Sequence, residues 1–445
     1  MNERLVRQAL LPLHERLRGR ATMRFYHRLR AHDRMQADAM QELQWQRLKK
    51  LLAHCLEHVP FYRDRLRGAG ITDVNELTRQ RYERLPQLTR DDIRNHKEAM
   101  VARGWRERLI QANTGGSTGE PLVFYSDRGK EACHNAQKLR ARSWFGVMPG
   151  DRQVDFWGSP IELNKQSELR ILKDRWLLNQ VVLSAFNLTD QRLSDYVAFV
   201  VRFRPRLIYG YPTVIFRVAQ WIREHPGVLG DYRPALVSCT SEMLYDHQRN
   251  MIREVFDCPV ANEYGSRDGG LIAHECPQGS LHIIAEHVYL EVVGEDEEGA
   301  GDLLVTNLDG YGMPLLRYRI GDRGTLDNTP CACGLPLPCL ARLSGRSNDF
   351  LVGHAGRLIH SLAPIYVLRE IPKLRQFRLY QRKDHSLQLQ MVSDAPFSDA
   401  ELRDLREKLQ RILDEPVPVD FQFAETIPPE RSGKYRWVMS EAPVQ

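Results

Sequence analysis

The 445-residue sequence lacks any apolar run close to the roughly 20 residues that a membrane-spanning helix requires. Its N-terminus is too polar for a secretory signal, so we expect a cytoplasmic protein. It also lacks an internal repeat, a low-complexity tract and a recognisable nucleic-acid-binding module, so we expect no nucleic-acid partner. With 42% apolar and 27% charged residues, the chain is long enough for a globular protein of two or three domains.

Cysteine is scarce, and the eight cysteines are too few for a disulfide scaffold in a chain of this length. Three of them lie near a histidine in two short segments, and three thiolates with one imidazole match a structural Zn²⁺ site. The expected ligands are Cys276, His282, Cys331 and Cys333. His274 and Cys339 compete for the fourth position, and free buried cysteines are the alternative to any metal.

The net charge of +6 is concentrated near the N-terminus, where residues 1–50 hold twelve Arg or Lys against five Asp or Glu. Leu10, Leu13 and Leu17 recur at helical spacing, which predicts amphipathic helices with a basic outer face. A solvated helical surface is the simpler interpretation. Peripheral contact with an anionic membrane surface or an acidic partner is the alternative.

The segment 114–119 combines three glycines with three hydroxyl side chains. Glycines let a backbone turn closely around an anion, while hydroxyl and N–H groups donate to phosphate oxygens. The segment lacks the Gly-Lys-Ser/Thr ending of phosphate-loop kinases and ATPases, which excludes that class. The apolar run 122–125 follows, so we expect a loop at the mouth of a hairpin. The candidate phosphate-binding residues are Thr114, Gly115, Gly116, Ser117, Thr118 and Gly119.

Four weaker motifs follow along the chain, and each alone is also compatible with an ordinary turn. Tyr264 and Asp268 flank a glycine turn at Gly265, where an aromatic face can stack on a purine and a carboxylate can hold Mg²⁺. Asp322 follows a strand and a glycine, and can accept hydrogen bonds from a ribose diol. The polar segment 344–350 lies at a domain boundary, where it can absorb backbone rotation. Lys434, on a glycine turn, can present its charge to a reacting carboxylate or phosphate.

The hydrophobic periodicity predicts layered α/β structure followed by a small α+β unit. Residues 1–100 are expected to be mostly helical, apart from an irregular segment at 59–62. Buried strands and intervening helices come next, at 154–158, 191–203, 207–212, 214–224 and 236–240. An antiparallel section is expected at 282–284, 288–293 and 303–307. The last unit is expected to hold two short strands within 350–359, strands at 376–382 and 387–392, and a helix at 399–413.

In this order and spacing, the five motifs resemble the acyl-adenylate-forming superfamily, and within it the phenylacetate–CoA ligase family with its CapK-like branch of capsule biosynthesis. The resemblance covers nearly the whole chain, including residues 59–62 and 85–89. It implies a large N-terminal adenylate-forming domain over 1–344, layered α/β with a β-rich subdomain, in which 1–100 are a helical, basic lead-in. A small, mobile α+β C-terminal domain would span 345–445.

The resemblance also implies roles for single residues. The loop 114–119 would bind the ATP phosphates, and Asp268 would bind Mg²⁺. Asp349 would be the hinge of the C-terminal domain, and Lys434 would bridge the substrate carboxylate and the α-phosphate. The remaining ATP-binding residues would be Ser241, Glu242, Tyr264, Gly265 and Asp322.

Three positions depart from the superfamily pattern. Leu122 stands where a Lys often follows the loop, and Arg267 replaces a small hydroxyl residue. Asp268 replaces Glu, which shortens the reach of the carboxylate by one methylene. Arg267 adds a positive charge that an anionic substrate can use. These departures keep a catalytically silent nucleotide-binding scaffold open as an alternative.

We therefore expect an acid–CoA ligase that uses ATP and Mg²⁺ to convert a small-molecule carboxylic acid into an acyl-adenylate and then a CoA thioester. Because no CoA-binding signature is evident, transfer of the acyl or AMP group to another acceptor in polysaccharide biosynthesis is the close alternative. Aromatic residues in the predicted strands would either line an aromatic or medium-size acyl pocket or belong to the core. They are Phe156, Trp157, Tyr209 and Tyr211, together with the adjacent Pro212.

Overall fold

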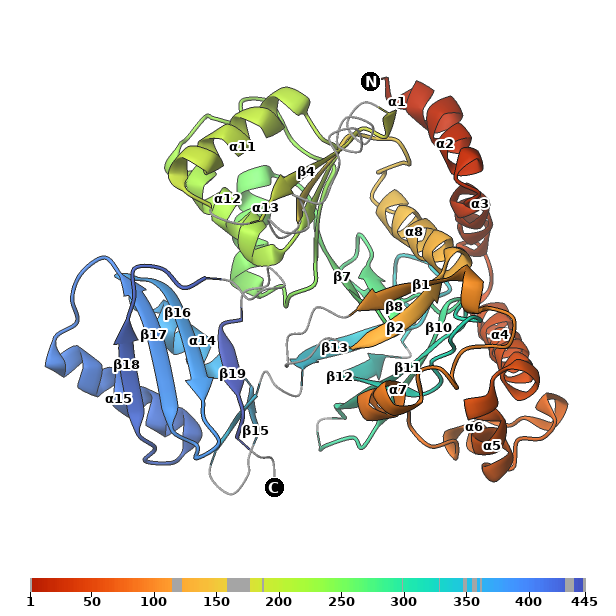
Figure 1. Ribbon diagram of the computed structural model, residues 1–445. Helices are drawn as coiled ribbons and strands as arrows, with labels where there is room; N and C mark the ends of the chain where they lie inside the picture. The colour runs from red at the N-terminus through yellow and green to blue at the C-terminus, as the bar shows by residue number, and fades with distance from the viewer. Residues whose placement is uncertain are drawn as a thin grey trace. The chain divides into compact units, whose positions relative to one another are not determined.

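The computed structural model describes residues 2–113, 122–157, 177–185, 188–297, 299–327, 329–346, 350–353, 358–360, 362–428 and 436–442 (Figure 1). The chain divides into two compact units. The first comprises Met1–Ile320 and Gly324–Leu343, and the second comprises Gly321–Arg323 and Ser344–Gln445. Among the residues that the structure describes, no helix is both long and apolar enough to cross a membrane.

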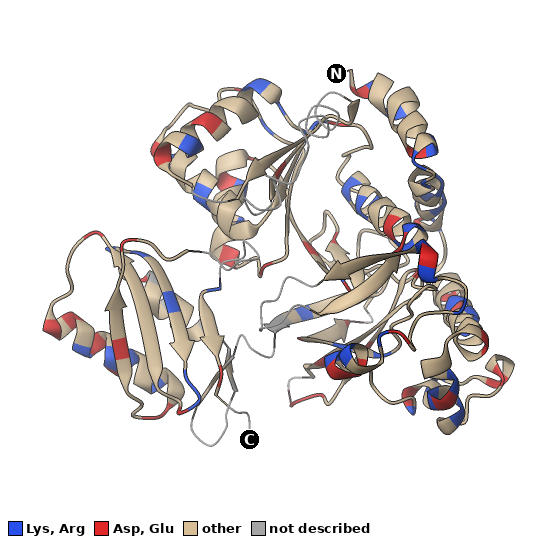
Figure 2. Cartoon of the chain, in the orientation of Figure 1, with Lys and Arg blue, Asp and Glu red and all other residues tan. Residues whose placement is uncertain are grey.

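The first hundred residues are mostly helical, as expected. The helices are α1 (Glu3–Leu5), α2 (Leu11–Leu17), α3 (Thr22–His32), α4 (Ala37–His58), α5 (Pro60–Gly68), α6 (Arg79–Glu83) and α7 (Arg90–His96). The expected irregular segment at 59–62 was wrong, because Pro60 begins α5. Proline suits this position, since its ring fixes a helical φ and the first turn needs no N–H donor. Lys and Arg recur along these helices (Figure 2), and Leu13 and Leu17 of α2 are exposed rather than buried.

The first unit is built on an eleven-stranded sheet. Its parallel part contains β3 (Gln153–Trp157), β4 (Gln180–Ser184), β5 (Leu207–Gly210), β6 (Leu236–Thr240) and β7 (Val260–Ser266). Helices α11 (Asp190–Phe203), α12 (Pro212–Glu224) and α13 (Asp246–Phe256) connect these strands and share their apolar core. Apolar strands alternating with amphipathic helices give the expected α/β layering.

From β7 onward the same sheet becomes antiparallel where pairing is described. These strands are β8 (Gly270–Glu275), β9 (Leu281–Ile283), β10 (Val288–Val293), β11 (Gly301–Asn307), β12 (Tyr318–Asp327) and β13 (Cys339–Arg346). The expected antiparallel section is confirmed. Asp322, however, lies within β12 and not after a strand as expected.

A hairpin and a helix complete the frame of the first unit. Strands β1 (Leu109–Asn113) and β2 (Val123–Asp127) pair antiparallel, so the expected hairpin around the loop is confirmed. Helix α8 (Arg128–Ser143) follows β2 directly. Asp127 caps its N-terminus by accepting a hydrogen bond from the Lys130 backbone N–H at 2.9 Å.

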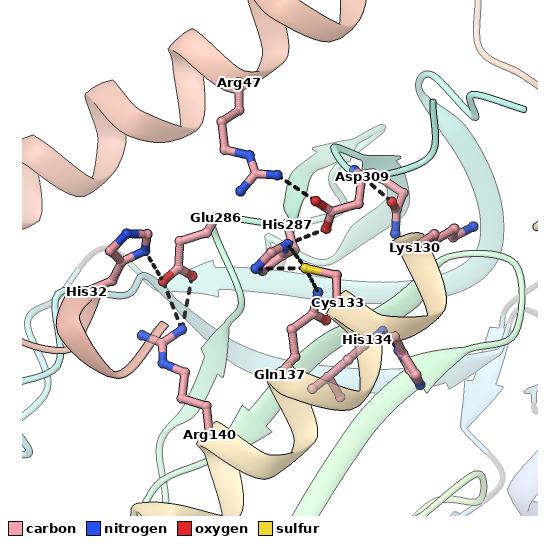
Figure 3. Close-up of polar contacts among 12 residues, drawn as sticks. His32, Arg47, Lys130, Cys133, His134, Gln137, Arg140, Glu286, His287 and Asp309 are labelled. Carbon is pink, nitrogen blue, oxygen red and sulfur yellow. Dashed lines mark hydrogen bonds and ion pairs between the residues drawn. The ribbon is translucent and has the colours of Figure 1, made fainter. Parts of the chain in front are cut away.

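Helix α8 is held by a buried ion pair (Figure 3). Arg140 and Glu286 are both fully buried, and Arg140 Nη1 donates to the two carboxylate oxygens of Glu286 at 2.9 and 3.1 Å. His32 Nδ1 of α3 lies 3.4 Å from the same carboxylate. Burial alone would raise the pKa of Glu286, but Arg140 and His32 together lower it well below its ordinary value. The pair therefore joins α3, α8 and the turn before β10.

We expect Glu286→Ala to lower the free energy of unfolding by about 3 kcal/mol, because the buried guanidinium loses one of its two counter-charges and keeps Asp33. Urea unfolding at pH 7 measures this loss, with exposed Glu254→Ala of α13 as the matched control. Because folding lowers the pKa of Glu286, the carboxylate contributes fully at neutral pH and loses its contribution as the pH falls through the acid range. Equal midpoints for the two variants would contradict the role of the pair.

The second unit is a small α+β fold. It contains β14 (Phe350–Val352), β15 (Leu358–His360), α14 (Leu362–Arg369), β16 (Leu374–Gln381), β17 (Leu387–Ser393), α15 (Asp399–Leu413), β18 (Val419–Phe423) and β19 (Val438–Ser440). Its four-stranded sheet has the order β18-β17-β16-β19. Ser398 and Glu401 form a capping box that fixes the start of α15, the helix expected at 399–413.

Candidate functional site

Asp268 lies in the turn between β7 and β8 and is 3% exposed. Its Oδ2 accepts a hydrogen bond from the Tyr318 hydroxyl at 2.8 Å, and its Oδ1 accepts from the Gly269 N–H at 3.1 Å. The Ser266 hydroxyl also donates to Oδ1. The neighbouring strands thus hold the carboxylate in one orientation.

Lys130 of α8 is a buried cation beside this carboxylate that the sequence did not indicate. Its ammonium donates to the Asp268 carbonyl oxygen at 3.0 Å, and the residue is 7% exposed. Burial lowers the pKa of Lys130, while Asp268 and Asp127 act to raise it. A lysine within a helical pattern has no local marker, so only the fold reveals this position.

His134, one turn along α8, was missed for the same reason. Its Nδ1 accepts the Leu271 N–H at 3.1 Å, so the imidazole proton of the neutral ring lies on Nε2. Burial lowers the pKa of His134 to about 3, which keeps the ring neutral. Asn307, at the end of β11, donates to the Gly269 carbonyl at 2.9 Å and was also missed. These contacts fix the turn after Asp268 against α8 and β11.

The turn after Asp268 leaves no room for a side chain at Gly270. Its φ is +87°, and a Cβ there would lie 2.9 Å from Asn307 Nδ2. Gly265 is equally constrained, because its Cβ would meet the Gly270 carbonyl oxygen at 2.5 Å. The expected glycine turn at Gly265 was wrong: β7 continues to Ser266 with a bulge beside Tyr264, and the chain turns afterwards.

A cavity of about 290 Å³ opens at this place in the first unit. Ser266 and Arg267, next to Asp268, form one side of it. The paired residues Ala112 and Phe124, at the end of the β1–β2 hairpin, form another. The cavity therefore lies between the Asp268 turn and the hairpin that carries the glycine-rich loop.

The other expected nucleotide-binding residues are distributed as follows. Tyr264 is 8% exposed and packs within the main apolar core, and Asp322 is equally buried in β12. Ser241 adopts a left-handed conformation with φ of +70° directly after β6. The Glu242 carboxylate accepts from the Thr213 hydroxyl at 2.6 Å at the start of α12. Thr114–Gly119, Asp349 and Lys434 lie outside the described residues.

The four expected zinc ligands lie together in the first unit, and their ligand atoms are all within 4.8 Å of one another. Cys276 Sγ lies 3.8 Å from Cys331 Sγ, and Cys333 Sγ lies 3.2 Å from His282 Nε2. Thiolates on a tetrahedral zinc would be roughly 3.8 Å apart. His282 Nδ1 contacts the Leu337 carbonyl oxygen at 2.9 Å, which leaves Nε2 for a metal.

Neither competing ligand completes that cluster in the described chain. Cys339 Sγ contacts Nδ1 of His282, at 3.4 Å, and so lies on the side of the ring facing away from the other thiols. His274 is occupied elsewhere, with Nδ1 2.7 Å from the Glu275 carbonyl oxygen and Nε2 3.4 Å from the Ser238 hydroxyl.

A second cluster was not expected from the sequence because its members come from three separate elements. Cys133, His287 and Asp309 point toward one another in Figure 3, with Cys133 Sγ 3.2 Å from His287 Nδ1. Arg47 of α4 pairs with Asp309 at 2.5 Å. Burial raises the pKa of the Cys133 thiol well above its ordinary value. The cluster joins α4, α8 and the ends of β10 and β11.

The aromatic residues of the parallel strands belong to the core. Trp157 stacks on Tyr209 and Tyr211, with ring centroids 5.8 and 4.6 Å apart, and both tyrosines are buried. The Tyr209 hydroxyl donates to Glu263 at 2.7 Å, and Lys138 of α8 lies 3.3 Å from the same carboxylate. Within the described chain, none of these aromatic rings borders the cavity beside Asp268.

Comparisons with known proteins agree with this architecture. A model of the CapK C-terminal domain matches residues 351–441. Protein CapK of Staphylococcus aureus is 27% identical over 414 residues, covering 90% of this chain and 89% of that protein. A phenylacetate-coenzyme A ligase of Thermus thermophilus is 25% identical over 443 residues, covering 90% and 96%.

The fold is also that of a solved ligase. The crystal structure of 2-hydroxyisobutyryl-CoA ligase in the postadenylation state superposes with a TM-score of 0.71 at 18% identity, covering 92% of this chain and 91% of that chain. On these matches, the chain is similar over nine-tenths of its length to Protein CapK and to a phenylacetate-coenzyme A ligase, and it has the fold of 2-hydroxyisobutyryl-CoA ligase.

Proposed function

We propose that this protein activates a carboxylic acid with ATP and transfers the acyl group to coenzyme A. A substrate carboxylate oxygen attacks the α-phosphorus, pyrophosphate leaves, and the CoA thiol then displaces AMP from the acyl carbon. The observation that carries this proposal is the position of Asp268, a buried carboxylate beside a cavity that also borders the glycine-rich hairpin. The similarity to phenylacetate-coenzyme A ligases supports it.

The residues around Asp268 fit one protein ligand for Mg²⁺. Mg²⁺ usually takes one or two carboxylates and fills its remaining positions with phosphate oxygens and water. Asp268 Oδ2 accepts one hydrogen bond, from Tyr318, and keeps lone-pair capacity for a cation. When bound, the ion would offset the charge of the phosphates as the carboxylate approaches.

The remaining roles are proposed on the resemblance of the motifs. Thr114–Gly119 would hold the phosphates, and Lys434 would offset the charge between carboxylate and α-phosphate. Asp349 would let the C-terminal domain, residues 345–445, turn between the two half-reactions. The nucleoside would contact Ser241, Glu242, Tyr264, Gly265 and Asp322.

The cysteine cluster supports a structural zinc site. Three thiolates and one imidazole in this geometry complete a tetrahedron, and no position remains for a substrate. The cluster ties the segment after β8 to the segment before β13, so we assign its metal to folding and not to catalysis.

A non-CoA acceptor is the second candidate function. It is favoured by the match to Protein CapK over 90% of this chain and by the CapK C-terminal domain at residues 351–441. An acceptor in polysaccharide biosynthesis would leave the adenylation step unchanged. The exposed Leu13, Arg16 and Leu17 of α2 would then make any peripheral membrane contact. A cytoplasmic location suits either acceptor, since ATP is supplied there.

We expect the purified protein to catalyse acid-dependent exchange of labelled pyrophosphate into ATP without CoA, because adenylation is reversible. A panel of aryl, aliphatic, hydroxy and dicarboxylic acids identifies the substrate, and reactions without acid give the background. CoA is then added with the active acid, and formation of the acyl-CoA thioester supports CoA as the acceptor. Trapping of the acyl-adenylate by hydroxylamine without thioester formation supports another acceptor. Absence of exchange with every acid, in a protein that binds ATP, would favour the silent scaffold.

A further inference from the structure

Nine of the twelve residues that line the cavity beside Asp268 are polar or charged. Two basic side chains, two carboxylates, a histidine, two amides and two serines surround it, and Ala112 and Phe124 are its apolar residues. The polar residues are Ser126, Lys130, Glu131, His134, Gln137, Ser266, Arg267, Asn307 and Asp309. A pocket for an aryl acid would instead be lined predominantly by apolar and aromatic side chains.

Two of these side chains have donors to spare. Lys130 uses one N–H on the Asp268 carbonyl oxygen, and its other two have no acceptor within the described chain. His134 accepts the Leu271 N–H through Nδ1, so the Nε2–H of this neutral ring is available at the cavity wall. Both residues project from α8, four positions apart and therefore on one face of the helix (Figure 3).

Because these donors are buried, they favour an acyl group that can accept their hydrogen bonds over one that cannot. An apolar acyl group would exclude water from the Lys130 ammonium and the His134 imidazole without replacing the lost hydrogen bonds, which costs binding free energy. An acyl group that carries a hydroxyl, carbonyl or second carboxylate oxygen would replace them.

We propose that this cavity takes the acyl part of the substrate and selects a small carboxylic acid with a second oxygen function near its carboxylate, such as a hydroxy acid, an oxo acid or a dicarboxylic acid. The inference rests on the proposed adenylation. Lys130 and His134 determine the preference by donating to that oxygen. The reacting carboxylate then lies toward Asp268 and the glycine-rich hairpin, which border the same cavity.

Matched pairs of acids test the proposal in the pyrophosphate exchange assay. The pairs are lactate with propionate, 3-hydroxybutyrate with butyrate, and succinate with butyrate, with phenylacetate as the aryl acid. We expect at least one oxygenated acid to exceed its partner in kcat/KM by about 10- to 10⁴-fold, the range for a site that donates hydrogen bonds to its substrate. Equal or greater activity with the unsubstituted and aryl acids would overturn the inference and leave the proposed function standing.

Substitutions of His134 test whether α8 determines the preference for oxygenated acids over unsubstituted ones. His134→Gln keeps an acceptor for the Leu271 N–H and a donor for the cavity, so it should retain most of the preference, whereas His134→Leu should reduce it at least about 10-fold. His27→Leu, at an exposed histidine of α3, is the matched control. An unchanged preference in His134→Leu would remove His134 from the site. If His134→Leu does not fold, the acid pairs measured with the unmodified protein still test the preference for a second oxygen function. Exchange with no acid at all would overturn both proposals.

Discussion

Replacing Asp268 by Asn is expected to slow acid-dependent pyrophosphate exchange by at least about 100-fold while leaving the protein folded. The carboxamide has nearly the shape of the carboxylate and can still accept hydrogen bonds from Ser266 and Gly269. Its amide group can donate to the Tyr318 hydroxyl oxygen in the place of the present bond. What the variant loses is the negative charge that would hold Mg²⁺ beside the phosphates.

The measurement is kcat/KM for exchange over a range of Mg²⁺ concentrations, with thermal unfolding as the check on folding. Asp64→Asn, at an exposed position of α5, is the matched control. We expect high Mg²⁺ to restore part of the activity of Asp268→Asn, because a weakened site is filled by mass action. Full activity at low Mg²⁺ would show that Asp268 is not a metal ligand, and Lys130 would become the main cation of the site.

The second large effect concerns the cysteine cluster. We expect the purified protein to contain about one zinc per chain and Cys331→Ser to contain less than about 0.1, because a serine hydroxyl is a far weaker zinc ligand than a thiolate. Since the site joins two segments of the β-rich part of the first unit, loss of the metal should also lower the melting temperature by several degrees.

Elemental analysis after extensive dialysis gives the zinc content, and calorimetry gives the melting temperature. Cys258→Ser, outside the cluster, controls for loss of a buried thiol. Cys339→Ser tests the boundary of the site, because Cys339 contacts the ring nitrogen of His282 that faces away from the cluster, and this variant should keep its zinc. A metal-free unmodified protein, or full zinc content in Cys331→Ser, would contradict a zinc site at this cluster and leave it as three free thiols beside an imidazole.

Much of the fold could be predicted because the sequence periodicity is regular. The strand β10 and the helix α15 have the predicted limits, since alternation and the Ser398–Glu401 capping box are both local signals. Pro60 was misinterpreted, because a proline that interrupts a pattern and one that begins the next helix look alike in sequence. Asp322 was placed after a strand because Gly321 suggested a strand end, whereas β12 passes through a positive φ at that glycine and continues.

The candidate site was predictable only where its residues are close in sequence. Tyr264, Gly265 and Asp268 lie within five consecutive residues, and the cysteine and histidine candidates fall into two short segments with metal-like spacing. Lys130, His134 and Asn307 reach the cavity from a helix and a distant strand, where nothing in the local sequence distinguishes them from surface residues. Their role depends on long-range packing, which a single sequence does not encode in any local pattern.

Helix α8 meets three different surroundings, and this limits how the acid preference can be engineered. Lys130 and His134 face the cavity, Cys133 and Arg140 meet His287 and Glu286, and Lys138 contacts Glu263. A library that randomises the whole helix would mostly return unfolded chains, because most substitutions would break a buried polar contact. Restricting diversity to the cavity-facing positions 130, 134 and 137 would limit the broken contacts to those of Lys130 and His134 with the Asp268 turn and of Gln137 with Cys133.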